Sequence, residues 1–172
     1  DLLQRLDRPG PRYTSYPTVP AWTTEFDAGS WRAALEDLAH QPERELSIYA
    51  HLPYCVKRCH YCGCNAAIPD SRGDIDRYLD HLEKELDLVA GILGRRKVVQ
   101  MHWGGGTPNF QSDDQIRRTW SLMADRFELD GELSLECDPR AAKAEQPHLL
   151  RELGFNRISM GVQDFAPEVQ EA

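Results

Sequence analysis

The hydrophobic positions of this chain follow two spacings, and each spacing predicts a different kind of element. Apolar residues three or four positions apart predict helices over residues 27–40, 74–93, 113–127 and 145–153. Short, mainly apolar runs predict strands over residues 46–51, 98–103, 133–137 and 157–162. Ser30 is a candidate N-cap of the first helix, and Gly154 is the expected end of the last. Because strands and helices alternate after residue 45, the sequence predicts an α/β fold of parallel strands with helical crossovers.

The polar or unusual residues of this pattern lie where the predicted strands end. Cys55 follows the first strand, and residues 104–107, Gly-Gly-Gly-Thr, follow the second. Residues 136–138 end the third strand, and residues 163–164 follow the fourth. Since the carboxyl ends of parallel strands lie at one edge of a sheet, these residues are expected to form a single site.

The pattern also divides the chain into two regions. Residues 1–45 are rich in proline and contain one short predicted helix, so we expect an N-terminal arm. Residues 46–172 carry the alternating strands and helices and form the second region. After the fourth strand, residues 164–172 look like a helix that is just starting, and a four-stranded parallel sheet would leave one edge uncovered. We therefore expect the chain to be a fragment of a larger protein.

Composition and charge narrow the classes of function. The formal net charge of −8 argues against a nucleic-acid partner, because such proteins collect Lys and Arg against phosphate. No apolar run is long enough to cross a bilayer, and the first residues lack the form of an export signal, so we expect a cytoplasmic protein with no membrane partner. Four of the five cysteines lie within ten residues, which favours a metal site over a disulfide scaffold.

The cysteine loop is the most informative segment. Cys55, Cys59 and Cys62 are close enough in sequence to point into one small volume, as a [4Fe-4S] cluster requires. Three cysteines on four irons would leave one iron open to a cofactor that carries neighbouring amino and carboxylate groups. Two other readings remain open: a zinc site that uses His60 or a fourth cysteine, and a fully ligated cluster with Cys64 as its fourth ligand.

The loop and several further motifs resemble a known family. The spacing C-x3-C-x2-C after a strand resembles the radical S-adenosylmethionine (SAM) enzymes. The chain as a whole is similar to the oxygen-independent coproporphyrinogen III oxidases within that superfamily. The motifs that carry this resemblance are residues 10–18, 49–55, 62–65, 102–108, 136–140 and 156–165. The proline-rich opening and Cys64 favour this family over its haem-chaperone relatives, and family members are far longer than 172 residues.

The resemblance implies a fold and a set of cofactor contacts. The fold would be a partial (β/α) TIM-like barrel, with Cys55, Cys59 and Cys62 on the cluster. The family holds two SAM molecules, and the resemblance places Tyr49, Gly105 and Glu136 nearer the first and Tyr61, Gly106, Thr107 and Gln163 nearer the second. From the residues alone, Tyr49 could instead be a core aromatic residue, the glycines a simple turn, and Glu136 the partner of Arg140 in a surface ion pair.

The resemblance also implies a reaction. A 5′-deoxyadenosyl radical would remove hydrogen from two propionate side chains of coproporphyrinogen III, and loss of carbon dioxide would give the vinyl groups of protoporphyrinogen IX. Such a reaction needs an electron donor protein and a final electron acceptor, and the full-length form is expected to be a monomer. The alternatives are a haem chaperone of the same superfamily and a non-catalytic metal-binding module. The sequence assigns no catalytic residue to this chain.

Overall fold

The computed structural model describes residues 19–171 of the chain. The chain divides into two compact units, Asp1–Ala34 and Leu35–Ala172, so the boundary lies inside helix α2 (Ala28–Ala39). The proline-rich motif at residues 10–18 lies outside the described residues, and the division predicted after residue 45 remains a prediction. In the first unit, a short 3-10 helix η1 (Val19–Ala21) precedes α2.

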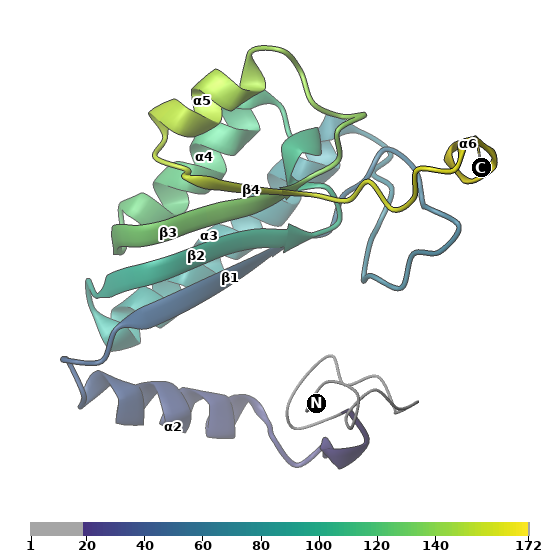
Figure 1. Ribbon diagram of the computed structural model, residues 1–172. Coiled ribbons are helices and arrows are strands. Elements are labelled where there is room, and N and C mark those ends of the chain that lie inside the picture. Colours follow the sequence, from purple (N-terminus) through teal and green to yellow (C-terminus); the bar gives the residue numbers. More distant parts are fainter. Residues whose placement is uncertain (1–18, 172) are drawn as a thin grey trace, which may run out of the picture. The chain divides into compact units, whose positions relative to one another are not determined.

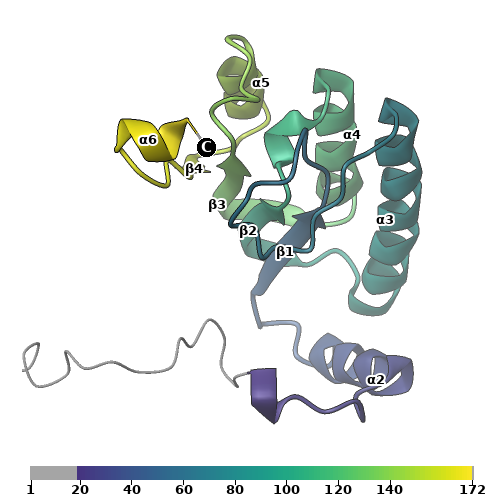
Figure 2. The ribbon, with the colours of Figure 1, turned by 90° about the vertical axis from the view of Figure 1, so that its right-hand side faces the viewer.

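The second unit is built from alternating strands and helices, as the sequence predicts. Its strands are β1 (Leu46–Leu52), β2 (Lys97–Gly105), β3 (Glu128–Cys137) and β4 (Arg157–Met160). Its helices are α3 (Arg72–Leu93), the 3-10 helix η2 (Pro108–Phe110), α4 (Asp113–Ala124), α5 (Gln146–Glu152) and α6 (Pro167–Gln170). All strand pairs are parallel, in the order β1-β2-β3-β4, and α3, α4 and α5 cover one face of the sheet (Figures 1 and 2). The predicted parallel α/β architecture is confirmed.

The helix starts are set by short polar side chains. The carboxylate of Asp27 accepts a hydrogen bond from the backbone N–H of Ser30 at 2.8 Å, so Asp27 rather than Ser30 caps α2. Helix α3 begins two residues earlier than predicted, because the backbone N–H of Ser71 donates to the carboxylate of Asp74 at 2.8 Å and closes the first turn. Gly154 has φ +100 after α5, the left-handed conformation that the sequence predicts for the end of this helix.

The buried core lies between the sheet and its covering helices. Trp103 of β2 is fully buried, packs its ring against Phe155 at 4.8 Å between centroids, and donates from Nε1 to Met123 Sδ at 3.3 Å. Leu79 of α3 and Ile116 of α4 are also fully buried against this layer. Each such side chain contributes about 1.5–3 kcal/mol through burial, so the core fixes the strands whose ends carry the site.

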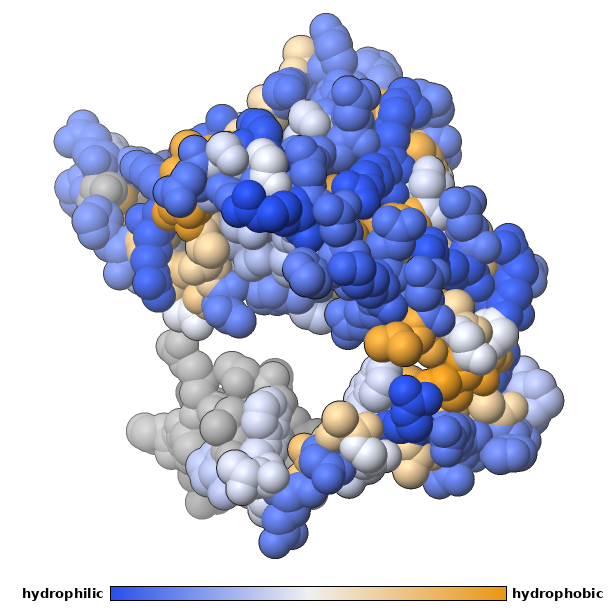
Figure 3. Space-filling view, turned by 180° about the vertical axis from the view of Figure 1, so that it is seen from behind, coloured by the Kyte–Doolittle hydropathy of each residue, from blue (hydrophilic) through white to orange (hydrophobic). Residues whose placement is uncertain are grey.

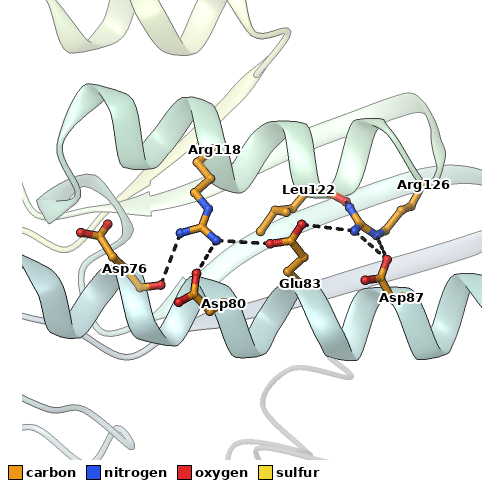
Figure 4. Close-up of polar contacts among 7 residues, drawn as sticks. All are labelled: Asp76, Asp80, Glu83, Asp87, Arg118, Leu122 and Arg126. Carbon is orange, nitrogen blue, oxygen red and sulfur yellow. Dashed lines mark hydrogen bonds and ion pairs between the residues drawn. The ribbon is translucent and has the colours of Figure 1, made fainter.

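Helices α3 and α4 are also joined by ion pairs. Arg118 Nη2 lies 2.6 Å from the carboxylate of Asp80 and 3.3 Å from that of Glu83, while Arg126 Nη2 lies 2.6 Å from Asp87 (Figure 4). The face shown in Figure 3 is mainly hydrophilic, in keeping with charged residues on the outer sides of the helices. None of the helices within residues 19–171 is long and apolar enough to span a membrane.

The far edge of the sheet is apolar and open to solvent. β4 pairs with β3 on one side, and all four of its residues are exposed. They include Ile158 and Met160, which are 41% and 55% exposed. In the segment beyond β4, Val162 and Phe165 are exposed as well. The uncovered sheet edge that the sequence predicts is therefore present in the described part of the chain.

Candidate cofactor site

The carboxyl ends of the first three strands lie next to one another. Leu52 at the end of β1 pairs with Gly105 at the end of β2, and Trp103 of β2 pairs with Leu135 of β3. The loops that follow β1 and β2 leave the sheet at this edge, on the right of Figure 1. The strand-end residues predicted from the sequence are thus brought to one edge of the sheet.

The cysteine loop is fastened at its stem by backbone hydrogen bonds. Cys55 N donates to Ala67 O at 3.0 Å, and Ala67 N donates to Pro53 O at 2.9 Å, so the two ends of the loop run side by side. Thr107 N donates to Tyr54 O at 3.0 Å and joins the loop to the segment after β2. These bonds hold the start of the cysteine motif against residues 104–107, the glycine segment.

The three predicted cluster ligands lie near one another. Burial raises the pKa of the Cys55 thiol, a hydrogen bond from Thr107 acts in the opposite direction, and the nearby thiols of Cys62 and Cys59 raise it further. The pKa of the Cys64 thiol is also raised, first by burial and then by Cys62. All four are free thiols, and Cys64 is the exposed one of the group.

The donor set of the cysteine loop suits an iron–sulfur cluster. The cysteines of an iron–sulfur cubane bind separate irons through their thiolates. Cys55, Cys59 and Cys62 are free thiols that lie near one another in one loop. Their donor set therefore suits a [4Fe-4S] cluster.

Two of these sulfurs accept hydrogen bonds from residues distant in the sequence. Thr107 Oγ1 donates to Cys55 Sγ at 3.3 Å, and Arg140 Nη2 lies 3.7 Å from Cys59 Sγ. Arg140 forms its ion pair with Asp138, at 2.7 Å between Nη2 and Oδ2. The alternative in which Arg140 pairs with Glu136 is therefore wrong.

The glycine segment is required by the protein's own packing. Gly104 and Gly105 belong to β2 rather than following it. A Cβ atom at Gly105 would lie 2.5 Å from the ring of His51, and φ there is +109. A Cβ atom at Gly106 would lie 2.4 Å from the carbonyl oxygen of Pro53. The sequence interpretation, in which the glycines make room only for a ligand or a turn, misses this steric role.

Glu136 stands at the centre of a polar group on the sheet face away from the helices. Its Oε2 accepts from Gly105 N at 3.2 Å, and its Oε1 lies 3.6 Å from His102 Nε2. The ring of His102 contacts Ser134 Oγ through Nδ1 at 2.8 Å and lies parallel to the ring of Tyr49, at 6.0 Å between centroids. The half-exposed carboxylate of Glu136 is thus free to accept further hydrogen bonds.

Tyr49 belongs to the same group and is not a core residue. Its side chain is 59% exposed, and its hydroxyl oxygen lies 3.1 Å from His51 Nδ1. Burial and the charge of Glu136 together raise the pKa of its hydroxyl. His102 and Ser134 also belong to this group and were not among the predicted site residues. The alternation of β2 and β3 could have indicated them, since they share a face with Glu136.

The last two predicted residues lie at the margins of the site. Tyr61 is 67% exposed inside the cysteine loop. The pKa of its hydroxyl is raised by desolvation and by its hydrogen bond with Cys59. Gln163 is exposed, has φ +70, and follows the end of β4 by three residues. The paired part of the sheet ends with Met160 of β4 opposite Cys137 of β3, so Gln163 lies in the segment beyond the carboxyl end of β4.

Comparison with known proteins agrees with this geometry. Residues 49–172 match the radical SAM superfamily. The oxygen-independent coproporphyrinogen III oxidases of Salmonella typhimurium and Pseudomonas aeruginosa are each 44% identical to the chain. The match covers 98% and 100% of the chain but only 37% and 38% of those proteins. The chain thus spans a little over a third of the length of these curated relatives.

Two further comparisons define the relationship more closely. An oxygen-independent coproporphyrinogen III oxidase sequence from Mannheimia haemolytica is 41% identical, and the match covers 80% of the chain and 94% of that sequence. The solved structure of coproporphyrinogen III oxidase from Escherichia coli, a radical SAM enzyme, superposes with a TM-score of 0.84 at 43% identity. That superposition covers 92% of the chain and 36% of the solved structure. The chain therefore belongs to the radical SAM superfamily and, within it, to the family of oxygen-independent coproporphyrinogen III oxidases.

Proposed function

We propose that this chain supplies the cluster-binding and cofactor-binding part of an oxygen-independent coproporphyrinogen III oxidase. The main support for this proposal is the 44% identity to such an oxidase over 98% of the chain. The grouping of Cys55, Cys59 and Cys62 at one end of a parallel sheet supports it, because radical SAM chemistry needs a cluster beside the strand ends. The activity belongs to the whole protein, of which this chain corresponds to a little over a third.

The cysteine loop holds the metal centre. Radical SAM proteins use a [4Fe-4S] cluster and SAM, and the bound pair supplies a 5′-deoxyadenosyl radical that takes hydrogen from a carbon atom. Cys55, Cys59 and Cys62 would bind three of the irons, and Cys64 would remain unbound. The loop stem and the glycine segment hold these thiols in place, and the surrounding protein would exclude water and oxygen from the site.

The residues around the loop bind SAM. Glu136 presents a half-exposed carboxylate that already accepts from Gly105 N, so it can also accept from an ammonium group or a ribose hydroxyl. Tyr49 and Gly105 would complete the contacts to the first SAM. A second SAM would lie nearer Tyr61, Gly106, Thr107 and Gln163.

The substrate of the whole protein is coproporphyrinogen III, converted to protoporphyrinogen IX by oxidative decarboxylation of two propionate side chains. An electron donor protein reduces the cluster, and the full-length protein acts as a cytoplasmic monomer. The support for these assignments is the family relationship together with the fit of the cysteine loop.

The cluster assignment is tested by replacing each of the four loop cysteines by alanine in anaerobically reconstituted protein. Iron and sulfide content and visible absorption should fall to background for the Cys55, Cys59 and Cys62 variants and stay near the unmodified value for Cys64→Ala. Loss of the cluster in Cys64→Ala to the same extent would contradict an open iron. Zinc without sulfide in the unmodified protein would point to a simple metal-binding module.

The activity is tested on the full-length protein with reductant and SAM under anaerobic conditions. Formation of protoporphyrinogen IX from coproporphyrinogen III, with methionine and 5′-deoxyadenosine as co-products, is the expected result. Haem binding without any turnover would instead favour a haem chaperone of the same superfamily.

A further inference from the structure

The turn after β3 is fixed by buried polar side chains. Asn109, which is 1% exposed, accepts at Oδ1 from Asp138 N at 2.9 Å and donates from Nδ2 to Asp138 O at 3.0 Å. Gln146, 2% exposed, donates in turn to the backbone carbonyl of Asn109 at 2.9 Å. Because these amides are buried, they cannot replace these hydrogen bonds with bonds to water. They therefore hold the backbone of Asp138 in one position.

Asp138 in turn orients a guanidinium group. Arg140 Nε lies 3.0 and 3.3 Å from the two carboxylate oxygens of Asp138, and Arg140 Nη2 lies 2.7 Å from Oδ2. The backbone N–H of Arg140 also donates to Oδ1 at 2.9 Å. A guanidinium held by a carboxylate in this way loses little freedom when it donates again.

The same nitrogen that pairs with Asp138 Oδ2 also approaches a cysteine of the loop. Arg140 Nη2 is 3.7 Å from Cys59 Sγ, although the two residues lie 81 positions apart in the sequence. Arg140 could form its ion pair with Asp138 without any contact to Cys59. The ion pair alone therefore does not explain why the guanidinium lies beside the sulfur.

A second donor approaches another sulfur from a different element. Thr107, only 8% exposed, donates from Oγ1 to Cys55 Sγ at 3.3 Å. Its backbone N–H is fixed by Tyr54 O at 3.0 Å. The hydroxyl is therefore placed by the same backbone bonds that fasten the cysteine loop.

We propose that Thr107 and Arg140 are positioning residues that donate hydrogen bonds to two cluster-bound sulfurs and raise the reduction potential of the cluster. This inference rests on the proposed function. Reduction adds one electron, taken from a one-electron reductant, and no bond to the protein forms or breaks. Because the added negative charge spreads onto the sulfurs, hydrogen-bond donors and a cation beside them stabilise the reduced form.

The test is the midpoint potential of the reconstituted full-length protein without SAM, measured by anaerobic redox titration with detection by electron paramagnetic resonance. Arg140→Met, which keeps an unbranched apolar stem but removes the guanidinium, should lower the reduced-to-oxidised ratio at a fixed potential about tenfold, a shift of about 59 mV for one electron. Thr107→Val should shift the potential in the same direction by a smaller amount. Arg140→Lys and Thr107→Ser should each recover part of the loss.

Arg157→Met is the matched control. Arg157 is 61% exposed, close to the 59% of Arg140, and it also pairs with a carboxylate through two contacts, to Glu132 at 3.0 and 2.9 Å. It lies at the start of β4, at the other end of the strands from the cysteine loop. Its replacement should leave the midpoint potential unchanged.

The outcomes separate this inference from the proposed function. Unchanged potentials in both Arg140→Met and Thr107→Val, with an intact cluster, would overturn the inference and leave the proposed function standing. Failure of the unmodified protein to form any [4Fe-4S] cluster would overturn both. If Arg140→Met loses the cluster, two other comparisons replace it: Thr107→Val with Thr107→Ser, and Arg140→Lys with the unmodified protein. Equal midpoint potentials in all of these proteins would refute the inference.

Discussion

At the scale of single residues, Gly105 combines a steric demand with a positive φ. Replacement by alanine should lower the free energy of unfolding by about 1–3 kcal/mol, because the new Cβ meets the His51 ring at 2.5 Å on a backbone with φ +109. Chemical denaturation measures the loss. Gly91→Ala, where nothing lies within 4 Å, is the control and should stabilise α3 by about 0.5–1 kcal/mol.

The double variant Gly105→Ala with His51→Ala separates the steric clash from the backbone strain. It should recover part of the loss seen in Gly105→Ala, because the ring that the Cβ meets is gone while the positive φ remains. Equal stability of Gly105→Ala and the unmodified protein would contradict the steric role of this glycine.

Cys137 gives a prediction about pH. The residue is 8% exposed, and burial raises the pKa of its thiol from the ordinary 9.0 to about 11. The unfolded chain therefore loses this proton first as pH rises, so the contribution of Cys137 to stability is complete below pH 9 and declines between pH 9 and 11. Since one pKa unit corresponds to about 1.36 kcal/mol, the decline is at most about 3 kcal/mol.

Comparison with Cys137→Ala isolates this decline from the other titrating groups. The alanine variant should be less stable at pH 7 by about 1 kcal/mol, because a buried sulfur is lost, and the difference should shrink or reverse by pH 11. Free energies of unfolding across this pH range provide the measurement. Parallel pH curves for the two proteins would show that the thiol is not protected by the fold.

Cys137 and Arg140 differ in how much of their environment could be predicted from the sequence. The burial of Cys137 could be predicted, because alternation along a strand assigns its face directly. The partner of Arg140 was not predictable in this way. Glu136 lies on the sheet face away from the helices, while the turn after β3 folds Arg140 back onto Asp138. The approach of Arg140 to Cys59 depends on tertiary structure and has no sequence signal.

At the scale of elements, Arg126, two residues beyond the end of α4, joins that helix to two carboxylates of α3. Its Nη2 lies 2.6 Å from Asp87 and 3.7 Å from Glu83, and its Nη1 donates to the backbone carbonyl of Leu122 at 2.8 Å. Arg126→Met should lower the free energy of unfolding by about 1 kcal/mol, because it also leaves Glu83 and Asp87 as like charges one helical turn apart. The loss should be smaller at high salt, where screening weakens both effects.

Arg117→Met is the matched control for this prediction. Arg117 pairs with the single exposed carboxylate of Glu152, so its replacement should cost clearly less than that of Arg126. Denaturation of both variants at low and high salt gives the comparison. Equal losses that do not respond to salt would mean that the α3–α4 ion pairs do not stabilise the packing of these helices.

The hydrophobic pattern does not predict where each helix and strand begins and ends. β3 begins at Glu128, five residues before its predicted start, although residues 128–132 read Glu-Leu-Asp-Gly-Glu. Pairing with β2, from Lys97 opposite Glu128 onward, extends the strand through a polar stretch whose own preference is for a turn. Tertiary pairing therefore decided the boundary, whereas the existence of the four strands and their succession along the chain followed from the hydrophobic pattern.

At the scale of the whole molecule, the sheet of the second unit has one apolar edge. Ile158 and Met160 of β4 and Phe165 beyond it are exposed, and Phe165 is 87% exposed. An edge strand with free backbone groups and apolar side chains is a surface on which two chains can pair. The 172-residue chain by itself is therefore expected to self-associate, and it is not expected to turn over coproporphyrinogen III, because a barrel site for so large a substrate needs further strands.

This last prediction is tested by light scattering and activity on the isolated 172-residue chain. The mass should exceed the 19.6 kDa of one chain and rise with concentration. Met160→Lys should shift the population towards the monomer, because a charge on an edge strand opposes pairing, while Leu88→Lys on the outer side of α3, also an exposed apolar position, should not. Turnover by a monomeric 172-residue chain would mean that the four strands already enclose a complete site. Self-association that is unchanged in Met160→Lys would place the contact away from β4.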